Sequence, residues 1–311
     1  MITLGRRPLS SSKRCPFEGS RVTPDAVTDL TPAKETAPAK VGTDWLGELR
    51  GIFGLILAVL IFHSLIAKPF YIPSESMVPG LLVGDRLVVT KYPYGWSYVS
   101  ATFHLLPFMK GRLLGSLPER GDVVIVTPPG SKEDYIKRVI GLPGDTLEVR
   151  GGTVILNGTP VKRVDMGERR IPVDANQPCS DLEYPGRKIR GGDGLEYCQL
   201  PIVRETLPNG RSYDTVDLGY NWRADDYAAI KIPANRVFLM GDNRDLSADS
   251  RFPLAEKGLG GPVPWENIGG RAEFITFSLD GSSKWWNPVS WLTALRGSRA
   301  GNSLHPQRTT G

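Results

Sequence analysis

The residues best suited to chemistry are two serines, Ser74 and Ser76, in the segment YIPSESMVPGL at 71–81. A serine hydroxyl attacks a carbonyl carbon efficiently only when a neighbouring base takes its proton. The segment contains no histidine, which is the usual partner of a serine nucleophile. Either the two serines belong to a surface turn, or their base comes from elsewhere in the chain.

Histidine is a poor candidate for that base. His63 lies inside a long apolar run, His305 lies near the C-terminus, and the segment TFHLLPF around His104 has no carboxylate to orient an imidazole. The HExxH signature of zinc proteases and the GxSxG nucleophile elbow do not occur in the sequence. A Ser–His–Asp triad and a metalloprotease site are therefore disfavoured.

A lysine can replace histidine as the base if burial removes its charge. An ordinary lysine has a pKa of about 10.4, and lowering it by two to three units needs a differential penalty of roughly 3–4 kcal/mol, which a packed core can impose. In DYIKRVIGLPGD, strand alternation places Lys137 on one face between Tyr135 and Val139. Because a lysine in a strand often extends its amine to water, this segment alone does not decide the matter.

The segment MGDNRDLSADSR at 240–251 favours a site built around Lys137. It follows an apolar strand expected at 237–239 and concentrates acids, arginines and serines in one turn. Arg244 and Ser247 interrupt the ligand spacing of a calcium loop, so no metal is expected here. We interpret the turn as a set of aspartate–arginine pairs beside a site, in which Ser247 hydrogen-bonds the lysine amine and aims it.

The apolar run from Gly51 to Ala67 precedes the two serines and carries no formal charge. It is slightly short for a hydrocarbon core at about 1.5 Å per residue, but apolar neighbours on both sides extend it. A buried core helix is the alternative, but the sequence has no amphipathic helices to cover one. We therefore predict an uncleaved membrane anchor, and the basic residues before the run weakly favour a cytoplasmic N-terminus.

The rest of the chain predicts short strands. Runs such as DRLVVTKY, GDVVIV, DTLEV and RAEFITFSL are rich in β-branched and aromatic residues and are separated by Gly, Pro and Asn. A more polar and irregular stretch lies between them, which indicates a smaller subdomain inserted into a β core. The predicted organisation is a disordered tail at 1–44, the anchor at 45–69, the β core at 70–161 and 231–283, the insertion at 162–230 and a membrane-proximal tail at 284–311.

Composition leaves several alternatives open. A net charge of +5 over 311 residues fits attraction to anionic phospholipid or a solvated surface, and no nucleic-acid-binding signature is present. Trp285, Trp286 and Trp291 suit a membrane interface or a short helix packed on the domain. Cys179 and Cys198 either form a disulfide worth roughly 3 kcal/mol or remain two buried thiols, and no histidine near them indicates zinc.

Five segments, taken together, resemble the bacterial type I signal peptidases, which are membrane-anchored serine proteases with a Ser–Lys dyad. They are PSESM at 73–77, GDRLVV at 84–89, RGDVVIV at 120–126, YIKRVIGLPGD at 135–145 and GDNRDLSADSR at 241–251. With the predicted strands, the resemblance implies a mainly β fold. We expect a membrane-anchored antiparallel sheet or partly open barrel, an inserted smaller β-rich subdomain and one N-terminal transmembrane helix.

The resemblance also implies roles for individual residues. Ser76 is the nucleophile, Lys137 the general base, Ser74 with the Ser76 N–H the oxyanion hole, and Ser247 the residue that orients the lysine. Glu75 stands between the two serines, where a small residue is common in the family, and its side chain can point to solvent from there. Leu246 replaces the usual asparagine before Ser247. The remaining implied residues are the ion pairs Asp242–Arg138 and Asp249–Arg251, a Cys179–Cys198 disulfide, and pockets for small side chains formed by Phe70, Ile72, Met77, Leu81, Ile125, Tyr135 and Ile136.

The predicted function is a membrane-bound serine endopeptidase that cleaves signal peptides from exported preproteins after small residues of the Ala-x-Ala type. Its partners are preproteins and membrane phospholipid, with no cofactor, metal or nucleic acid. The resemblance places it in the bacterial inner membrane, with a cytoplasmic N-terminus and the catalytic domain on the periplasmic side. The alternatives are a narrower Ser–Lys peptidase that matures a single pilin or conjugation protein, and a non-catalytic anchored protein that binds peptides.

Overall fold

The structure is a computed structural model that describes residues 45–100 and 110–308 of the chain. The tail predicted to be disordered at 1–44 and the disfavoured His104 both lie outside the described residues.

The first described element, α1, is a 21-residue helix at Trp45–Leu65. None of its residues is buried, so the structure does not support the alternative of a core helix. At about 1.5 Å per residue, 21 residues reach roughly 31 Å, which matches the thickness of a hydrocarbon core. By length and composition, α1 is therefore able to cross a membrane.

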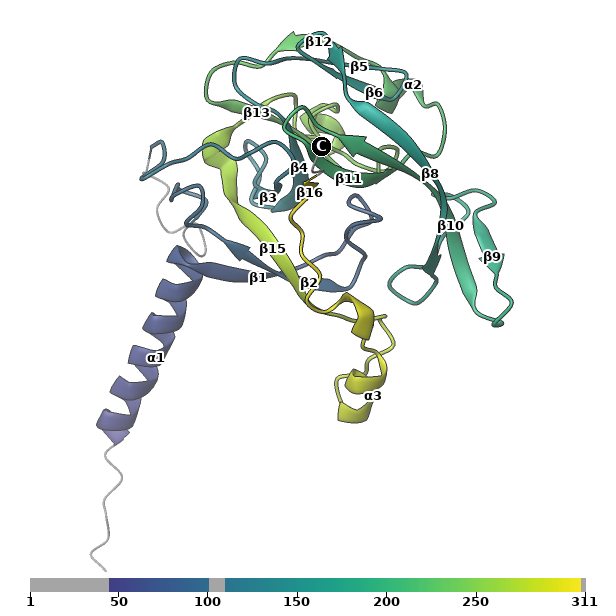
Figure 1. Ribbon diagram of the computed structural model, residues 1–311. Helices are drawn as coiled ribbons and strands as arrows, with labels where there is room; N and C mark the ends of the chain where they lie inside the picture. Colours follow the sequence, from purple (N-terminus) through teal and green to yellow (C-terminus); the bar gives the residue numbers. More distant parts are fainter. Residues whose placement is uncertain (1–44, 101–109, 309–311) are drawn as a thin grey trace, which may run out of the picture. The chain divides into compact units, whose positions relative to one another are not determined.

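The central sheet has seven strands in the order β1-β2-β15-β3-β4-β13-β14, and every neighbouring pair is antiparallel (Figure 1). It curls into a half-barrel, which agrees with the predicted mainly β fold. The strands that begin or end beside the two serines are β1 and β2, and the strand that carries the lysine is β4. The bounds are β1 Ala67–Tyr71, β2 Asp85–Thr90, β3 Val123–Val126, β4 Tyr135–Gly141, β13 Arg236–Met240, β14 Val263–Pro264 and β15 Ile268–Ser278.

Strand β4 is buried along its length apart from Tyr135, because it lies between β3 and β13. In the register of β3 and β4, Lys137 faces Val124 and Ile136 faces Ile125. The polar side chain of Lys137 is thus placed within a sheet of β-branched residues. This position explains how a lysine is kept away from water in a strand.

A four-stranded sheet has the strand order β12-β5-β6-β7. Gly151 and Gly152 connect β5 to β6, and Asn157 and Gly158 connect β6 to β7. All four have positive φ angles, between 51° and 78°, as tight hairpin turns require. The bounds are β5 Thr146–Arg150, β6 Thr153–Leu156, β7 Thr159–Pro160 and β12 Tyr227–Lys231.

The polar stretch that follows is more regular than its sequence suggests. Two strands of 11 residues, β8 at Lys162–Pro172 and β10 at Glu196–Thr206, form a long antiparallel ribbon (Figure 1). Most β8 side chains are exposed and many are charged, so the segment lacks an alternating apolar pattern. The same five-stranded sheet contains β9 at Lys188–Arg190, β11 at Arg211–Val216 and β16 at Gln307–Arg308.

A separate hydrophobic cluster joins this ribbon to the nucleophile segment. A disulfide links Cys179 to Cys198, which rules out the alternative of two free thiols in this structure. Both cysteines and Tyr184 pack in one cluster with Val78 and Leu82. The turn that follows Ser76 therefore packs against the disulfide.

The C-terminal part contains α3 at Pro288–Thr293, and a further short helix, α2, occupies Trp222–Asp225. Beyond α3, Arg296 pairs with Asp174, and Arg299 pairs with the fully buried Asp85 and donates to the Gly80 carbonyl. These contacts tie the segment after α3 to the residues that follow β8, to the start of β2 and to the loop between β1 and β2.

Candidate active site

Ser76 and Lys137 meet at the centre of the candidate site. Lys137 Nζ donates a hydrogen bond to Ser76 Oγ over 2.8 Å. Ser76 is 6% exposed and Lys137 is 4% exposed. Ser76 lies in the loop between β1 and β2, and Lys137 lies in the middle of β4. A hydroxyl and an amine from distant segments are therefore in contact and shielded from bulk water.

Burial lowers the pKa of Lys137 to about 8, because a charged ammonium is costly away from water. The carboxylates of Asp249 and Asp242 act in the opposite direction, and the Arg251 guanidinium adds to the lowering. The Tyr135 ring centroid lies 5.7 Å from Nζ. The net result is an amine that is substantially uncharged slightly above neutral pH, as a general base requires.

The dyad opens into a cavity of about 520 Å³. Five of the seven predicted pocket residues line it together with Ser74, Ser76 and Lys137. Met77 and Leu81 do not line it, and both are buried in the hydrophobic core cluster. The five predicted lining residues are Phe70, Ile72, Ile125, Tyr135 and Ile136.

Sequence reasoning missed several residues of this cavity. Leu246 and Ala248 line it beside the dyad, and Glu133, Asp134 and Lys257 add charge to its wall. The departure of Leu246 from the family pattern was visible in the sequence, but its apolar contact with the cavity was not. Glu133 and Asp134 directly precede the strand that carries Lys137, which is a signal that could have indicated them.

Ser74 lies next to the nucleophile position. Its Oγ is 3.4 Å from Ser76 Oγ, and both residues line the cavity. A hydroxyl at this distance is able to reach an oxygen atom bound to the carbon that Ser76 attacks. The arrangement can therefore stabilise developing negative charge on such an oxygen.

The loop after β13 fixes the backbone of Ser76. Asn243 N–H donates to the Ser76 carbonyl over 3.1 Å. A Cβ at Gly241 would lie 2.4 Å from that carbonyl oxygen and 2.1 Å from Ser247 Oγ. Only glycine therefore fits between Ser76 and Ser247.

Ser247 is buried beside Gly241, but its Oγ has no hydrogen-bond partner in the part of the chain that the structure describes. The expected bond from Ser247 to the Lys137 amine is thus not made in this structure. A buried hydroxyl without a partner is costly, so Ser247 has unused bonding capacity in the wall of the site.

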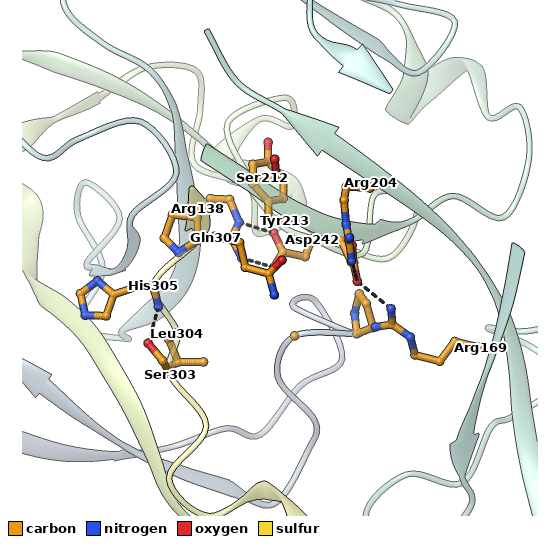
Figure 2. A pocket seen from close by; sticks show the side chains of 14 residues that line it. Arg138, Arg169, Arg204, Ser212, Tyr213, Asp242, Ser303, Leu304, His305 and Gln307 are labelled. Atoms are coloured by element: carbon orange, nitrogen blue, oxygen red, sulfur yellow. Dashed lines mark hydrogen bonds and ion pairs between the residues drawn. The ribbon is translucent and has the colours of Figure 1, made fainter. Parts of the chain in front are cut away.

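Two buried ion pairs hold the strand and the loop of the site. Arg138 Nε and Nη2 donate to Asp242 at 2.7 and 2.6 Å, and Arg251 Nε and Nη2 donate to Asp249 at 2.9 and 2.8 Å. Figure 2 shows the first pair in the wall of a second cavity, of about 200 Å³, which shares no lining residue with the first.

A third buried pair was not predicted. Arg244 donates to both carboxylate oxygens of Glu205 at 2.7 Å each, and joins the loop to β10. The sequence did not indicate this pair for two reasons. Arg244 was noted only as a residue that does not fit a calcium loop, and Glu205 lies in the stretch predicted to be irregular.

Glu75 differs from the expectation that its side chain points to solvent. Its Oε2 is buried without a partner among the described residues, and its carboxyl accepts a hydrogen bond from the Tyr184 hydroxyl. Burial raises the pKa of Glu75, and the neighbouring Glu183 carboxylate adds to the rise. The expectation was wrong because a buried tyrosine from the disulfide-linked segment covers this side of the loop.

Within residues 45–100 and 110–308, no group of three or more His, Cys, Asp or Glu side chains is placed to hold a metal ion.

Comparisons with known proteins all find signal peptidases. The signal peptidase family, peptidase S26, matches residues 45–277. The signal peptidase I of Rickettsia typhi is 33% identical over 270 residues, which cover 81% of this chain and 90% of that protein. That of Rickettsia akari is 34% identical over 241 residues, or 75% and 79% of the two chains.

A solved signal peptidase I from Enterococcus faecalis covers 50% of this chain and 97% of its own, with 21% identity and a TM-score of 0.26.

Proposed function

Because the chain belongs to the signal peptidase family, peptidase S26, we propose that it is a serine endopeptidase that removes signal peptides with Ser76 as nucleophile and Lys137 as general base. The observation that carries this proposal is the 2.8 Å contact between Lys137 Nζ and Ser76 Oγ at the wall of an open cavity. A binding protein without catalytic activity has no need for a buried amine against a buried hydroxyl, since burying the amine costs stability.

The reaction begins when the lone pair of the neutral Lys137 amine accepts the Ser76 proton. Ser76 Oγ bonds to the scissile carbonyl carbon, and the Ser74 hydroxyl with the Ser76 N–H stabilises the oxyanion. As the C–N bond breaks, the Lys137 ammonium returns the proton to the leaving amine. Water then gives a proton to Lys137 and attacks the acyl-enzyme, and the ammonium reprotonates Ser76 as the acid leaves.

The substrate is proposed to be a preprotein with small residues before the cleavage point, of the Ala-x-Ala type. The cavity walls next to the dyad are apolar and are formed by Ile72, Ile125 and Ile136, which are at most 6% exposed. Branched side chains that are already packed in a core cannot withdraw to admit a large residue without strain. Methyl groups are therefore expected to bind best.

Membrane attachment is proposed to use α1, with the N-terminus in the cytoplasm and the catalytic domain on the periplasmic side of the inner membrane. The 21-residue span, in which no apolar side chain is buried, supports contact with phospholipid acyl chains. This arrangement presents the cavity to a signal peptide that is still held in the bilayer.

The test is to incubate the purified full-length protein in lipid vesicles with a labelled preprotein and to locate the cut by mass spectrometry. We expect one cut after an Ala-x-Ala sequence, no cleavage by S76A, and loss of cleavage when the substrate residue before the cut is Leu or Phe. Cleavage by S76A would refute the proposed nucleophile. A panel of unrelated preproteins separates a general peptidase from one with a single substrate.

A further inference from the structure

Glu75 lies between the two serines of the site, but it takes no part in the proposed reaction. Ser74 and Ser76 line the cavity, whereas Glu75 does not. Its carboxyl instead reaches Tyr184, which is completely buried. The three consecutive side chains therefore diverge: two hydroxyls enter the cavity and the carboxyl between them enters the protein.

Asn243 and Tyr184 hold Glu75 at its backbone carbonyl and at its carboxyl. Asn243 Nδ2 donates to the Glu75 carbonyl over 3.2 Å and to the Tyr184 hydroxyl oxygen over 3.0 Å, which uses both of its hydrogens. The Tyr184 hydroxyl then has its own hydrogen left for the Glu75 carboxyl. Glu75 is thus held at its backbone and at its side chain by two residues that also contact each other.

The same two residues connect the nucleophile to a distant part of the chain. The backbone N–H of Asn243 donates to the Ser76 carbonyl over 3.1 Å. Tyr184 lies between Cys179 and Cys198, which the disulfide joins. Tyr184 also packs in the cluster that contains Val78, two residues after the nucleophile. The disulfide-linked segment therefore forms the support behind the loop that carries Ser76.

The cost of this arrangement argues for a role. A carboxyl with one buried and unpartnered oxygen is destabilising compared with a small side chain that has no polar atom to bury. Polar groups held in costly positions beside an active site usually fix the geometry of that site.

We propose that Glu75 is a positioning residue, which acts through Tyr184 and Asn243 to keep the hydroxyls of Ser74 and Ser76 side by side in the cavity. The proposal rests on the proposed function, because it assumes that Ser76 is the nucleophile. Glu75 does not touch the substrate or the reacting atoms. It restricts the backbone between the two serines, so that the nucleophile and the oxyanion donor both face the scissile carbonyl.

The experiment compares E75A, E75Q, Y184F and the double variant E75A/Y184F of the full-length protein in vesicles, with a fluorogenic peptide substrate. Misplacing reacting groups by about 1 Å costs on the order of 100-fold in rate. We therefore expect kcat to fall about 10- to 100-fold in E75A, with KM within about twofold of wild type. E75Q should recover most of that loss, because its amide oxygen still accepts the Tyr184 hydroxyl.

Y184F is expected to lower kcat as E75A does, and the double variant to be no worse than the poorer single variant, because all three break the same connection. D181A is the matched control. It removes an exposed carboxylate from the segment that presents Tyr184, and its kcat should stay within about twofold of wild type. Thermal unfolding of each variant is measured in parallel.

Wild-type kcat in E75A would overturn the proposal, and so would losses in E75A and Y184F that multiply in the double variant. If E75A does not fold, the test uses Y184F, which lacks a single hydroxyl. Wild-type kcat in Y184F would then overturn the proposal. S76A separates the two proposals: activity in S76A refutes the nucleophile, whereas an inactive S76A with a fully active E75A refutes only the role of Glu75.

Discussion

Lys137 Nζ lies 2.8 Å from Ser76 Oγ, although 61 positions separate the two residues in the chain. The contact exists because the loop after β1 and the buried strand β4 meet beside one cavity.

Replacing Lys137 with methionine should remove activity without harming the fold. K137M keeps the length of the side chain and loses the amine that accepts the Ser76 proton. We expect kcat/KM to fall by at least about 100-fold, the scale of general base catalysis. The thermal midpoint at pH 7 should equal or exceed that of wild type, because methionine needs no hydration. The control is K162M, at an exposed lysine, and wild-type rates in K137M would refute the lysine base.

The rate should depend on pH through the same amine. Burial lowers the Lys137 pKa to about 8, so kcat/KM should rise with pH and level off above that value. A maximum below neutral pH would contradict this assignment.

Stability should follow pH in the same region. Between the folded pKa of about 8 and the unfolded value of 10.5, the unfolded chain holds a proton that the folded chain lacks, so the free energy of unfolding should rise with pH in that window. The two pKa values differ by about 2.5, which corresponds to roughly 3 kcal/mol for this fully buried group. Urea unfolding of wild type and K137M as a function of pH measures the difference.

Removing the Ser74 hydroxyl should lower kcat more than it affects binding. Ser74 Oγ lies 3.4 Å from Ser76 Oγ and is proposed to stabilise the oxyanion, which exists only after the attack. Loss of one such donor costs about 100-fold in kcat. Steady-state kinetics of S74A test this, and S74T, which retains a hydroxyl, should recover part of the rate. A raised KM with unchanged kcat would assign Ser74 to substrate binding instead.

Breaking the buried pair of Asp249 and Arg251 should destabilise the loop behind the dyad. Asp249 is fully buried, and it also accepts the Gly241 N–H over 2.9 Å. D249N leaves the Arg251 guanidinium buried without a counter-charge, which costs about 3–5 kcal/mol. E148Q is the control, since it breaks a pair whose arginine, Arg150, is 72% exposed, and it should cost less than about 1 kcal/mol.

This pair should also contribute to acid sensitivity. The Arg251 guanidinium and two N–H donors outweigh burial and hold the Asp249 pKa below its usual value. The stabilisation is therefore complete above the unfolded pKa of about 4 and is lost as the pH falls below it. Urea unfolding at pH 7 and at pH 3 should show a smaller difference between D249N and wild type in acid, and an equal difference at both pH values would contradict the prediction.

Several features could be predicted because they depend on local pattern. Alternation in YIKRVIGL indicated that Lys137 shares a face with Tyr135 and Val139, and the structure buries it in β4. Short runs of β-branched residues predicted the strands of the central sheet. A strand that buries one face or both needs apolar residues at those positions, and this need is visible in the sequence. The charged segment of β8 was not recognised, since its hydrogen bonds to β10, rather than apolar burial, make it a strand.

The sequence by itself determined which groups are available for chemistry: two serines in a short segment, a lysine in an apolar strand, and an anchor long enough for a bilayer. Only the tertiary structure decided which side chains the cavity receives. Met77 and Leu81 entered the core, and Glu75 was covered by Tyr184. The physical reason is that strand and turn periodicity specifies the direction of a side chain, whereas the partner that it meets comes from a segment far away in the chain.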